Sequence, residues 1–235
     1  MNCGARTPAC RVETHLDTSW AVRVRAPQRT IVVALLLSTT LCAAPRLFYS
    51  KYFKGSVPEF VAITVERDGQ VTYQEAKDDD NPIRIQLDNA TTQELFDLTE
   101  KLDRFQRPLE SGLKIANLGI KTFRFEDGAE HHEIQFNYSE DANAQALLDR
   151  FERISETEQH FVNLDRTAHF EKLGVNDVLL QMQETWERNR LVAPEQFLPL
   201  LDRIAKNESY LHISRERAAA IAEAIRKPAS QTRGQ

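Results

Sequence analysis

Hydrophobic and polar residues alternate along two pairs of short segments, a pattern that predicts two β-hairpins. The first pair, Phe60–Val65 and Val71–Tyr73, flanks an Asp-Gly turn at positions 68 and 69; the second, Ile120–Phe125 and Ile134–Tyr138, flanks another at positions 127 and 128. Alternation places every second side chain on one face, as a half-buried sheet requires. A glycine in the turn allows the left-handed backbone of a tight hairpin. A further short strand is compatible with Ile83–Leu87.

The length of each turn fixes the expected register of the two strands that it joins. A three-residue loop in the first hairpin pairs Val65 with Val71 and Ile63 with Tyr73. A two-residue turn in the second hairpin aligns a mostly apolar set on one face, consisting of Phe123, Phe125, His132, Ile134 and Phe136.

Each predicted hairpin is followed by apolar residues at helical spacing. The first helix is expected to begin with Thr91 or Thr92 as its N-cap and to end before Pro108, and the second covers Asp141–Phe161. The order strand, strand, helix therefore occurs twice within residues 59–162. We predict an α+β fold of two ββα units that form a four-stranded antiparallel sheet with its helices on one face.

The segments that flank residues 59–162 have different patterns. Residues 45–58 are basic and aromatic and are interpreted as a tether or an extended lead-in. Residues 163–227 carry apolar side chains at helical spacing and are predicted to be helical throughout, with Pro194 at one helix start and Ser214 as the cap of the last helix. The tail at 228–235 is expected to be disordered.

An uncharged apolar segment near the N-terminus predicts export from the cytoplasm. Ile31–Ala44 contains no charged residue, follows three arginines and ends in the small pair Ala43 and Ala44. These are the parts of a secretory signal peptide, so residues 1–44 are interpreted as one, with cleavage after Ala43 or Ala44. The alternative is that residues 31–44 stay uncut and anchor the chain in the inner membrane.

The region before the apolar segment is long for an export signal and contains two acids. Glu13 and Asp17 are unusual there, because signal peptides have a positively charged start. We therefore expect that translation begins near Val22 or Val24, which would leave a compact signal.

Charge and cysteine content narrow the functional classes. The chain has a net charge of −5, which argues against a general nucleic-acid binder. Five of the 30 Lys and Arg and two of the 35 Asp and Glu lie before residue 44, so the mature chain has 25 bases against 33 acids, a net charge of −8. All three cysteines, Cys3, Cys10 and Cys42, also lie in the predicted signal. The mature chain would therefore have no disulfide and no thiolate ligand or nucleophile.

The strongest metal-like motif is His131-His132-Glu133. On a strand, His131 and Glu133 project to the same face and His132 to the other. Two ligands do not complete a zinc site, and the sequence lacks the helical HExxH spacing. We predict no metal site and interpret this segment as an exposed polar face with His132 at the margin of the core; His131 and Glu133 are the weak metal candidates.

No residue pattern identifies a catalytic centre. His160 and His169 flank a segment that contains Asp165, but neither has an identifiable nucleophile. The sequence contains no G-x-S-x-G, P-loop or G-x-G-x-x-G motif. The acidic run at residues 78–80 lacks the glycine of a calcium loop and is interpreted as a solvated turn. No catalytic residue and no cofactor are predicted.

The part of the chain from residue 59 to 161 resembles small bacterial exported domains of unknown function. The resemblance rests on a strand, an Asp-Gly turn, a second strand that ends in Tyr, a helix and another Asp-Gly hairpin. The matching segments are Ile63-Thr64-Val65, Asp68-Gly69, Val71-Thr72-Tyr73, Leu95–Leu102 and Asp127-Gly128. Residues 54–58 differ, because such domains often carry a cysteine there. The resemblance implies export and an α+β fold, and it assigns no catalytic residue.

Together these features predict a secreted or periplasmic, non-enzymatic binding module of the bacterial cell envelope. Its partner would be an unidentified protein or envelope component, bound by the uncovered face of the sheet or by the C-terminal helices. One alternative is an envelope hydrolase with an unrecognised site. Another is a membrane-anchored accessory subunit with an uncleaved signal, in which Arg46, Lys51 and Lys54 would lie beside anionic lipid headgroups. Membrane contact is expected only in that last case.

Overall fold

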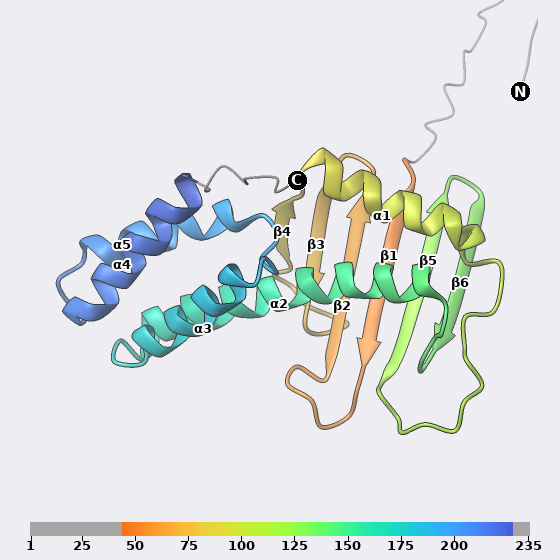
Figure 1. The fold of residues 1–235 in the computed structure, drawn as a ribbon, viewed down its shortest axis with the longest axis horizontal. Helices are drawn as coiled ribbons and strands as arrows, with labels where there is room; N and C mark the ends of the chain where they lie inside the picture. Colours follow the sequence, from red (N-terminus) through yellow and green to blue (C-terminus); the bar gives the residue numbers. More distant parts are fainter. Residues whose placement is uncertain (1–43, 228–235) are drawn as a thin grey trace, which may run out of the picture. The chain divides into compact units, whose positions relative to one another are not determined.

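A computed structural model describes residues 44–227 and confirms the α+β class. It contains a six-stranded antiparallel sheet in the order β4-β3-β2-β1-β5-β6 (Figure 1). The strands are β1 (Arg46–Tyr52), β2 (Phe60–Glu66), β3 (Gln70–Gln74), β4 (Ile83–Gln86), β5 (Ile120–Asp127) and β6 (Glu130–Phe136). The predicted signal, apart from Ala44, and the predicted tail at 228–235 lie outside the described residues. No helix within 44–227 is both long and apolar enough to span a membrane.

The first predicted hairpin forms in the expected register. The second places the expected residues on one face, although its turn consists of residues 128 and 129, because Asp127 pairs with Glu130. Val65 pairs with Val71 and Ile63 with Tyr73, and Phe123 faces Ile134 across the second hairpin. Gly69 has a φ of +86°, and a Cβ at this position would lie 2.7 Å from Gln86 Nε2 and 2.9 Å from the Leu87 carbonyl oxygen. The glycine is therefore required both by the left-handed backbone and by the close approach of β4.

The prediction of four strands was wrong, because two more strands complete the sheet. Residues 46–52, interpreted as part of a tether, form β1 between β2 and β5, and β4 pairs with β3 at one edge. The two strand–strand–helix units are thus joined through β1 and not directly to each other. In β1, Leu47 and Tyr49 are buried while Phe48 and Ser50 face the other side. Basic residues interrupt the alternation of β1, which is why the sequence pattern was interpreted as a lead-in and not as a strand.

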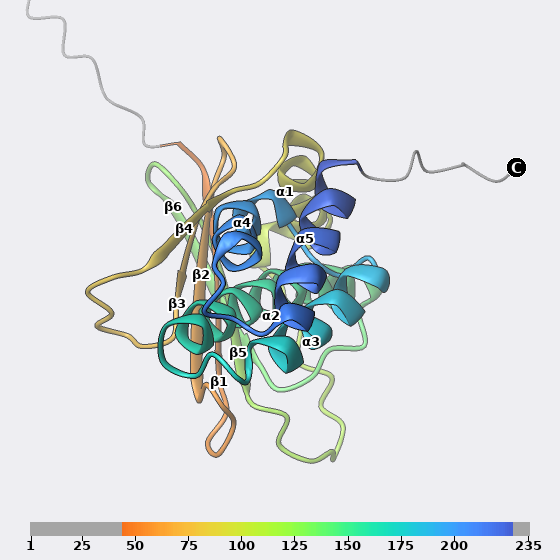
Figure 2. The same ribbon diagram turned by 90° about the vertical axis from the view of Figure 1, so that its left-hand side faces the viewer.

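Two helices cover one face of the sheet, as predicted. α1 (Asn89–Lys101) and α2 (Ala142–Phe170) lie on the same side of the strands in Figure 2, and no described helix lies on the opposite face. Their buried residues share one apolar core with the strands, in which Tyr49, Phe123 and Phe151 pack ring against ring. Asp88, and not Thr91 or Thr92, caps α1 by accepting a hydrogen bond from the Thr91 amide.

The C-terminal region is helical, as predicted, and α2 leads into it without a break. α2 continues to Phe170, so the boundary predicted between residues 162 and 163 lies inside this helix. It is followed by α3 (Val175–Glu187), the short 3-10 helix η2 (Pro194–Phe197), α4 (Leu198–Lys206) and α5 (His212–Arg226). These helices enclose a second apolar core. α5 begins two residues before Ser214, whose side chain is buried and does not cap the helix.

Candidate functional site

A hollow lies between the N-terminal half of α2 and the strands β1, β5 and β6. Its volume is about 420 Å³. Phe53, Leu118, Phe136, Ala144 and Leu148 give it apolar walls. Its polar lining comes from Lys51, Lys121, Asn137, Tyr138, Ser139, Gln145 and Glu152. A concave space that combines apolar walls with polar groups is the common form of a small-molecule site.

A second hollow of about 380 Å³ adjoins the first along α2. The two share Lys51 and Glu152, and the second is also lined by Tyr49, Val61, Ser155, Glu156, Gln159 and Arg190. We refer to the two hollows together as the α2 groove. Arg190 is held at the far end by Glu156 at 2.7 Å and Asp149 at 3.1 Å. The hydroxyl of Tyr49, which is buried beside the groove, makes no hydrogen bond.

Two lysines face each other across neighbouring strands in the floor of the groove. Lys51 of β1 and Lys121 of β5 are directly paired in the antiparallel register, and both side chains line the same hollow. Like charges at directly opposed positions repel each other and destabilise a sheet. Glu152 of α2 is the one acid that lines this hollow. The first hollow is therefore lined by two lysines and one acid, in a chain whose net charge is −5.

Lys121 is fixed by the loop that forms one wall of the groove. Its side chain is buried, and its Nζ donates to the carbonyl oxygens of Asn137 at 2.7 Å and of Leu118 and Gly119 at 3.3 Å. Burial, and next the charge of Lys51, lowers the pKa of Lys121, while Glu152 and Glu110 act in the opposite direction. Because all three N–H donors are engaged, Lys121 positions the loop and supplies charge, and its amine is not a free nucleophile.

The predicted weak metal candidates lie outside the groove. His131 and Glu133 project together from β6 on the uncovered face, as alternation predicts, opposite Glu126 and Arg124 of β5. His131 Nε2 lies 3.8 Å from Glu126, and Arg124 lies 3.6 Å from Glu133. Within residues 44–227, no three side chains of His, Cys, Asp or Glu gather as a metal site would require. The two candidates thus belong to a row of exposed ion pairs.

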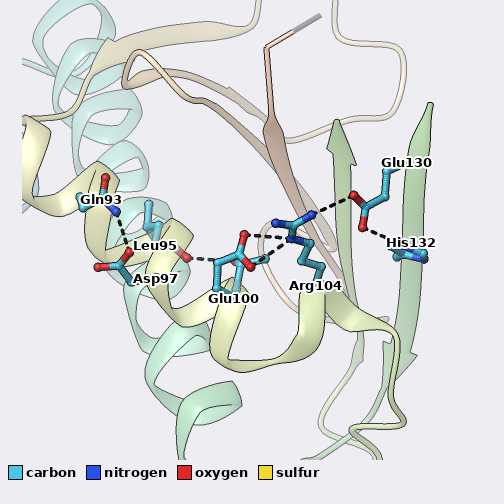
Figure 3. Close-up of polar contacts among 8 residues, drawn as sticks. Gln93, Leu95, Asp97, Glu100, Arg104, Glu130 and His132 are labelled. Atoms are coloured by element: carbon cyan, nitrogen blue, oxygen red, sulfur yellow. Dashed lines mark hydrogen bonds and ion pairs between the residues drawn. The ribbon is translucent and has the colours of Figure 1, made fainter. Parts of the chain in front are cut away.

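His132 points to the helix-covered side and joins an ion-pair network at the sheet edge. Its Nε2 lies 3.1 Å from Glu130, and Arg104 links Glu130 of β6 to Glu100 of α1 at 2.9 Å each (Figure 3). The Arg104 guanidinium also lies 5.3 Å from the centre of the Phe125 ring. This network ties the end of α1 to β6 and is partly exposed, which is typical of a structural role.

The two histidines considered as general bases do not share a site. His160 contacts Thr185 Oγ1 of α3 at 2.9 Å, and burial lowers its pKa. His169 is exposed near the end of α2 and contacts the Asp165 carbonyl oxygen at 2.8 Å. Each histidine thus binds a local partner in the helical region, and neither lines the groove.

Sequence reasoning missed one buried acid, Glu158 of α2. The residue is fully buried, its Oε1 accepts a hydrogen bond from Gln196 Nε2 at 2.9 Å, and its Oε2 has no partner. Burial raises the pKa of Glu158 to about 7, against the opposing effect of the hydrogen bond from Gln196. The residue is a pH-sensitive contact between α2 and the segment that contains η2.

Sequence reasoning also missed the groove lysines, although their spacing carries a signal. Lys51 lies two residues after Tyr49, and Lys121 lies two residues before Phe123, so each is in phase with the buried face of its strand. A lysine at a core-facing strand position is unusual enough to mark a site.

Comparison of the chain with models of known protein families finds no match, and neither does comparison with curated protein sequences.

Proposed function

We propose that the protein is an exported, non-enzymatic binding module of the bacterial cell envelope, and that its α2 groove holds a small molecule with an apolar body and an anionic head. The observation that carries this proposal is the pair Lys51 and Lys121, directly opposed in a hollow that also has apolar walls. An anion bound between or beside the two amines offsets their mutual repulsion, and apolar walls favour an aliphatic or aromatic body.

The two lysines are expected to have different roles in binding, because their surroundings differ. Lys121 is held by three carbonyl oxygens and contributes mainly its charge. Lys51 lines both hollows and is less buried, so it is the residue that we expect to contact the anionic head. The groove contributes charge and shape, while the amine of its buried Lys121 donates to carbonyl oxygens of the neighbouring loop. Both features support binding in preference to catalysis.

Export is supported by the sequence alone. The uncharged segment at residues 31–44 and the arginines before it are the basis for placing the protein in the periplasm or medium. The intact mass of the protein recovered from periplasmic and membrane fractions tests this part. A periplasmic species that starts at Ala44 or Pro45 supports export, whereas recovery from the cytoplasm alone contradicts it.

Binding is tested with a fluorescent fatty acid, 11-(dansylamino)undecanoic acid, in the absence of membranes. We expect its emission to rise and shift to the blue on binding, and unlabelled dodecanoate to displace it better than dodecanol. Lys51→Met retains the length of the side chain and removes its charge, so it should weaken binding about tenfold or more, as loss of a charge-assisted contact implies.

Lys77→Met is the matched control, because Lys77 borders a different hollow, next to Phe60. It should leave the affinity unchanged. Equal affinity of the Lys51→Met variant and the unsubstituted protein, or the absence of probe binding to folded protein, would contradict the proposal.

A further inference from the structure

Exposed apolar side chains gather at one end of the sheet, on two loops that lie side by side. Of the eleven large apolar residues that are exposed in the described part of the chain, six are at this end. They are Tyr52, Val57, Leu113, Ile115, Leu118 and Ile120. We refer to this set as the loop tip; it consists of residues in the β1–β2 loop and the loop that precedes β5, together with the strand residues Tyr52 and Ile120 next to them (Figure 1). A cluster of this kind marks an interaction surface.

The two loops are held together, so the loop tip is a defined surface. Tyr52 and Ile120 are paired across β1 and β5. A Cβ at Gly119 would lie 2.9 Å from Phe53 Cβ, which shows how closely the loops approach. Asn137 binds the second loop through the Leu118 amide at 2.7 Å and the Ala116 carbonyl oxygen at 3.0 Å.

Lysines are interleaved with the apolar residues of the loop tip. Lys54 and Lys114 are exposed within the two loops, and Lys51 and Lys121 lie just behind them. The two acids of the same segments are turned to backbone amides: Glu59 accepts from Gly55 at 3.0 Å and Glu110 from Asn137 at 2.6 Å. Counted with Lys51 and Lys121, this end of the molecule carries four lysines against these two acids, whereas the whole chain has a net charge of −5.

We infer that the loop tip docks on the surface of an anionic lipid bilayer. Apolar side chains enter the boundary between headgroups and acyl chains, and the lysines lie among the anionic headgroups, as in other peripheral membrane contacts. We favour a bilayer over a protein partner because lysines alternate with apolar residues in both loops, Lys54 between Tyr52 and Val57 and Lys114 between Leu113 and Ile115. This contact goes beyond the proposed ligand and needs neither a bound ligand nor an uncleaved segment at 31–44.

The contact also gives the α2 groove an orientation. Phe53 and Leu118 belong to the two loops and line the groove as well. Docking of the loop tip therefore places one wall of the groove at the bilayer surface, where molecules with an apolar body and an anionic head are concentrated.

The test is the depth of single tryptophan probes in vesicles of phosphatidylcholine and phosphatidylglycerol that carry brominated acyl chains. Leu113→Trp places a probe in the loop tip of the full chain. Phe170→Trp, at the end of α2, is the matched control, because Phe170 is a large exposed apolar residue outside the loop tip. The unsubstituted chain supplies the background from its two tryptophans.

We expect the added emission of Leu113→Trp to shift to the blue and to be quenched by brominated lipid, while that of Phe170→Trp is not. The local readout does not depend on how residues 31–44 behave. Failure of both probes to be quenched, or equal quenching of both, overturns the inference. Ile115→Trp serves as a second probe if the first variant does not fold.

The charge contribution is measured in the Leu113→Trp background. Replacing Lys54 and Lys114 together by Gln should weaken partitioning into anionic vesicles about 30-fold, since each lysine near such a surface contributes about a factor of five. The same replacement at Lys101 and Lys206, which are exposed outside the loop tip, should have little effect. Equal partitioning of the two double variants contradicts the role of charge. Because groove binding is measured without membranes, failure of the docking inference and failure of the proposed function are distinguishable.

Discussion

Replacing Glu158 by Gln should change how the stability of the protein depends on pH. The carboxyl group is fully buried on α2, accepts one hydrogen bond from Gln196 and leaves its second oxygen without a partner. Its protonated form is therefore favoured in the folded state, where the pKa is about 7 compared with 4.5 for an ordinary Glu. Gln has nearly the same shape as the protonated acid and retains the oxygen that Gln196 contacts.

The sign of the effect follows from proton binding. Between pH 4.5 and 7 the folded protein binds the Glu158 proton more tightly than the unfolded chain, so this residue makes stability fall as pH rises through that window. Above pH 7 both states are ionised and the penalty stays constant. Each unit by which the pKa of Glu158 differs between the folded and unfolded states corresponds to about 1.4 kcal/mol. The penalty therefore reaches about 3 kcal/mol at pH 8. The Gln variant does not carry this penalty.

Urea unfolding of both proteins, followed by circular dichroism from pH 4.5 to 8.5, measures the difference. The stability of the Glu158→Gln variant relative to the unsubstituted protein should increase by about 3 kcal/mol across this range, with most of the change complete near pH 7. Glu140→Gln, at an exposed acid, should show no such trend. A constant difference between the Glu158 variant and the parent at all pH values would refute the argument.

Two further predictions concern the groove loop and the first hairpin. Lys121→Met leaves three carbonyl oxygens without their donor, so it should lower the free energy of unfolding by about 1–3 kcal/mol. It should also speed amide hydrogen exchange at residues 113–119. Unchanged exchange there would contradict the role of Lys121 in holding the loop. Gly69→Ala forces a Cβ against Gln86 and Leu87 and should destabilise by about 1–3 kcal/mol in urea unfolding. Gly55 has a similar positive φ, but a Cβ there would meet no atom within 4 Å, so Gly55→Ala should lower the free energy of unfolding by less than Gly69→Ala does. Equal losses of stability would show that backbone strain, and not the close approach of β4, explains the effect at Gly69.

Local sequence patterns were sufficient to predict the parts of the fold that short-range physics determines. The alternation around the two Asp-Gly turns predicted both hairpins, the register of the first and the buried face of the second, and helical spacing predicted that α1 and α2 pack on one face. β1 was missed because its alternation is interrupted by charge: Lys51 occupies a core-facing position that is usually apolar. The predicted four-stranded sheet therefore lacked β1, the strand that joins β2 to β5.

The site was harder to predict, because its residues come together only through tertiary structure. Lys51 and Lys121 are 70 positions apart, and they meet because β1 pairs with β5. Glu158 is buried because the segment after α3 folds back onto α2, where Gln196 reaches it. Helical periodicity within α2 does not show that contact. The phase of the two lysines on their strands is the one local signal that sequence reasoning could have used.

The central claim is that the α2 groove selects a small anionic amphiphile. An NMR titration of the uniformly ¹⁵N-labelled protein with dodecanoate tests it most directly, because amide shifts locate the ligand along the chain. We predict shifts that are largest at Lys51, Lys121, Phe136 and Leu148, which line the groove. Shifts that are absent at millimolar dodecanoate, or that concentrate around Phe48 on the uncovered face of the sheet, would contradict the account.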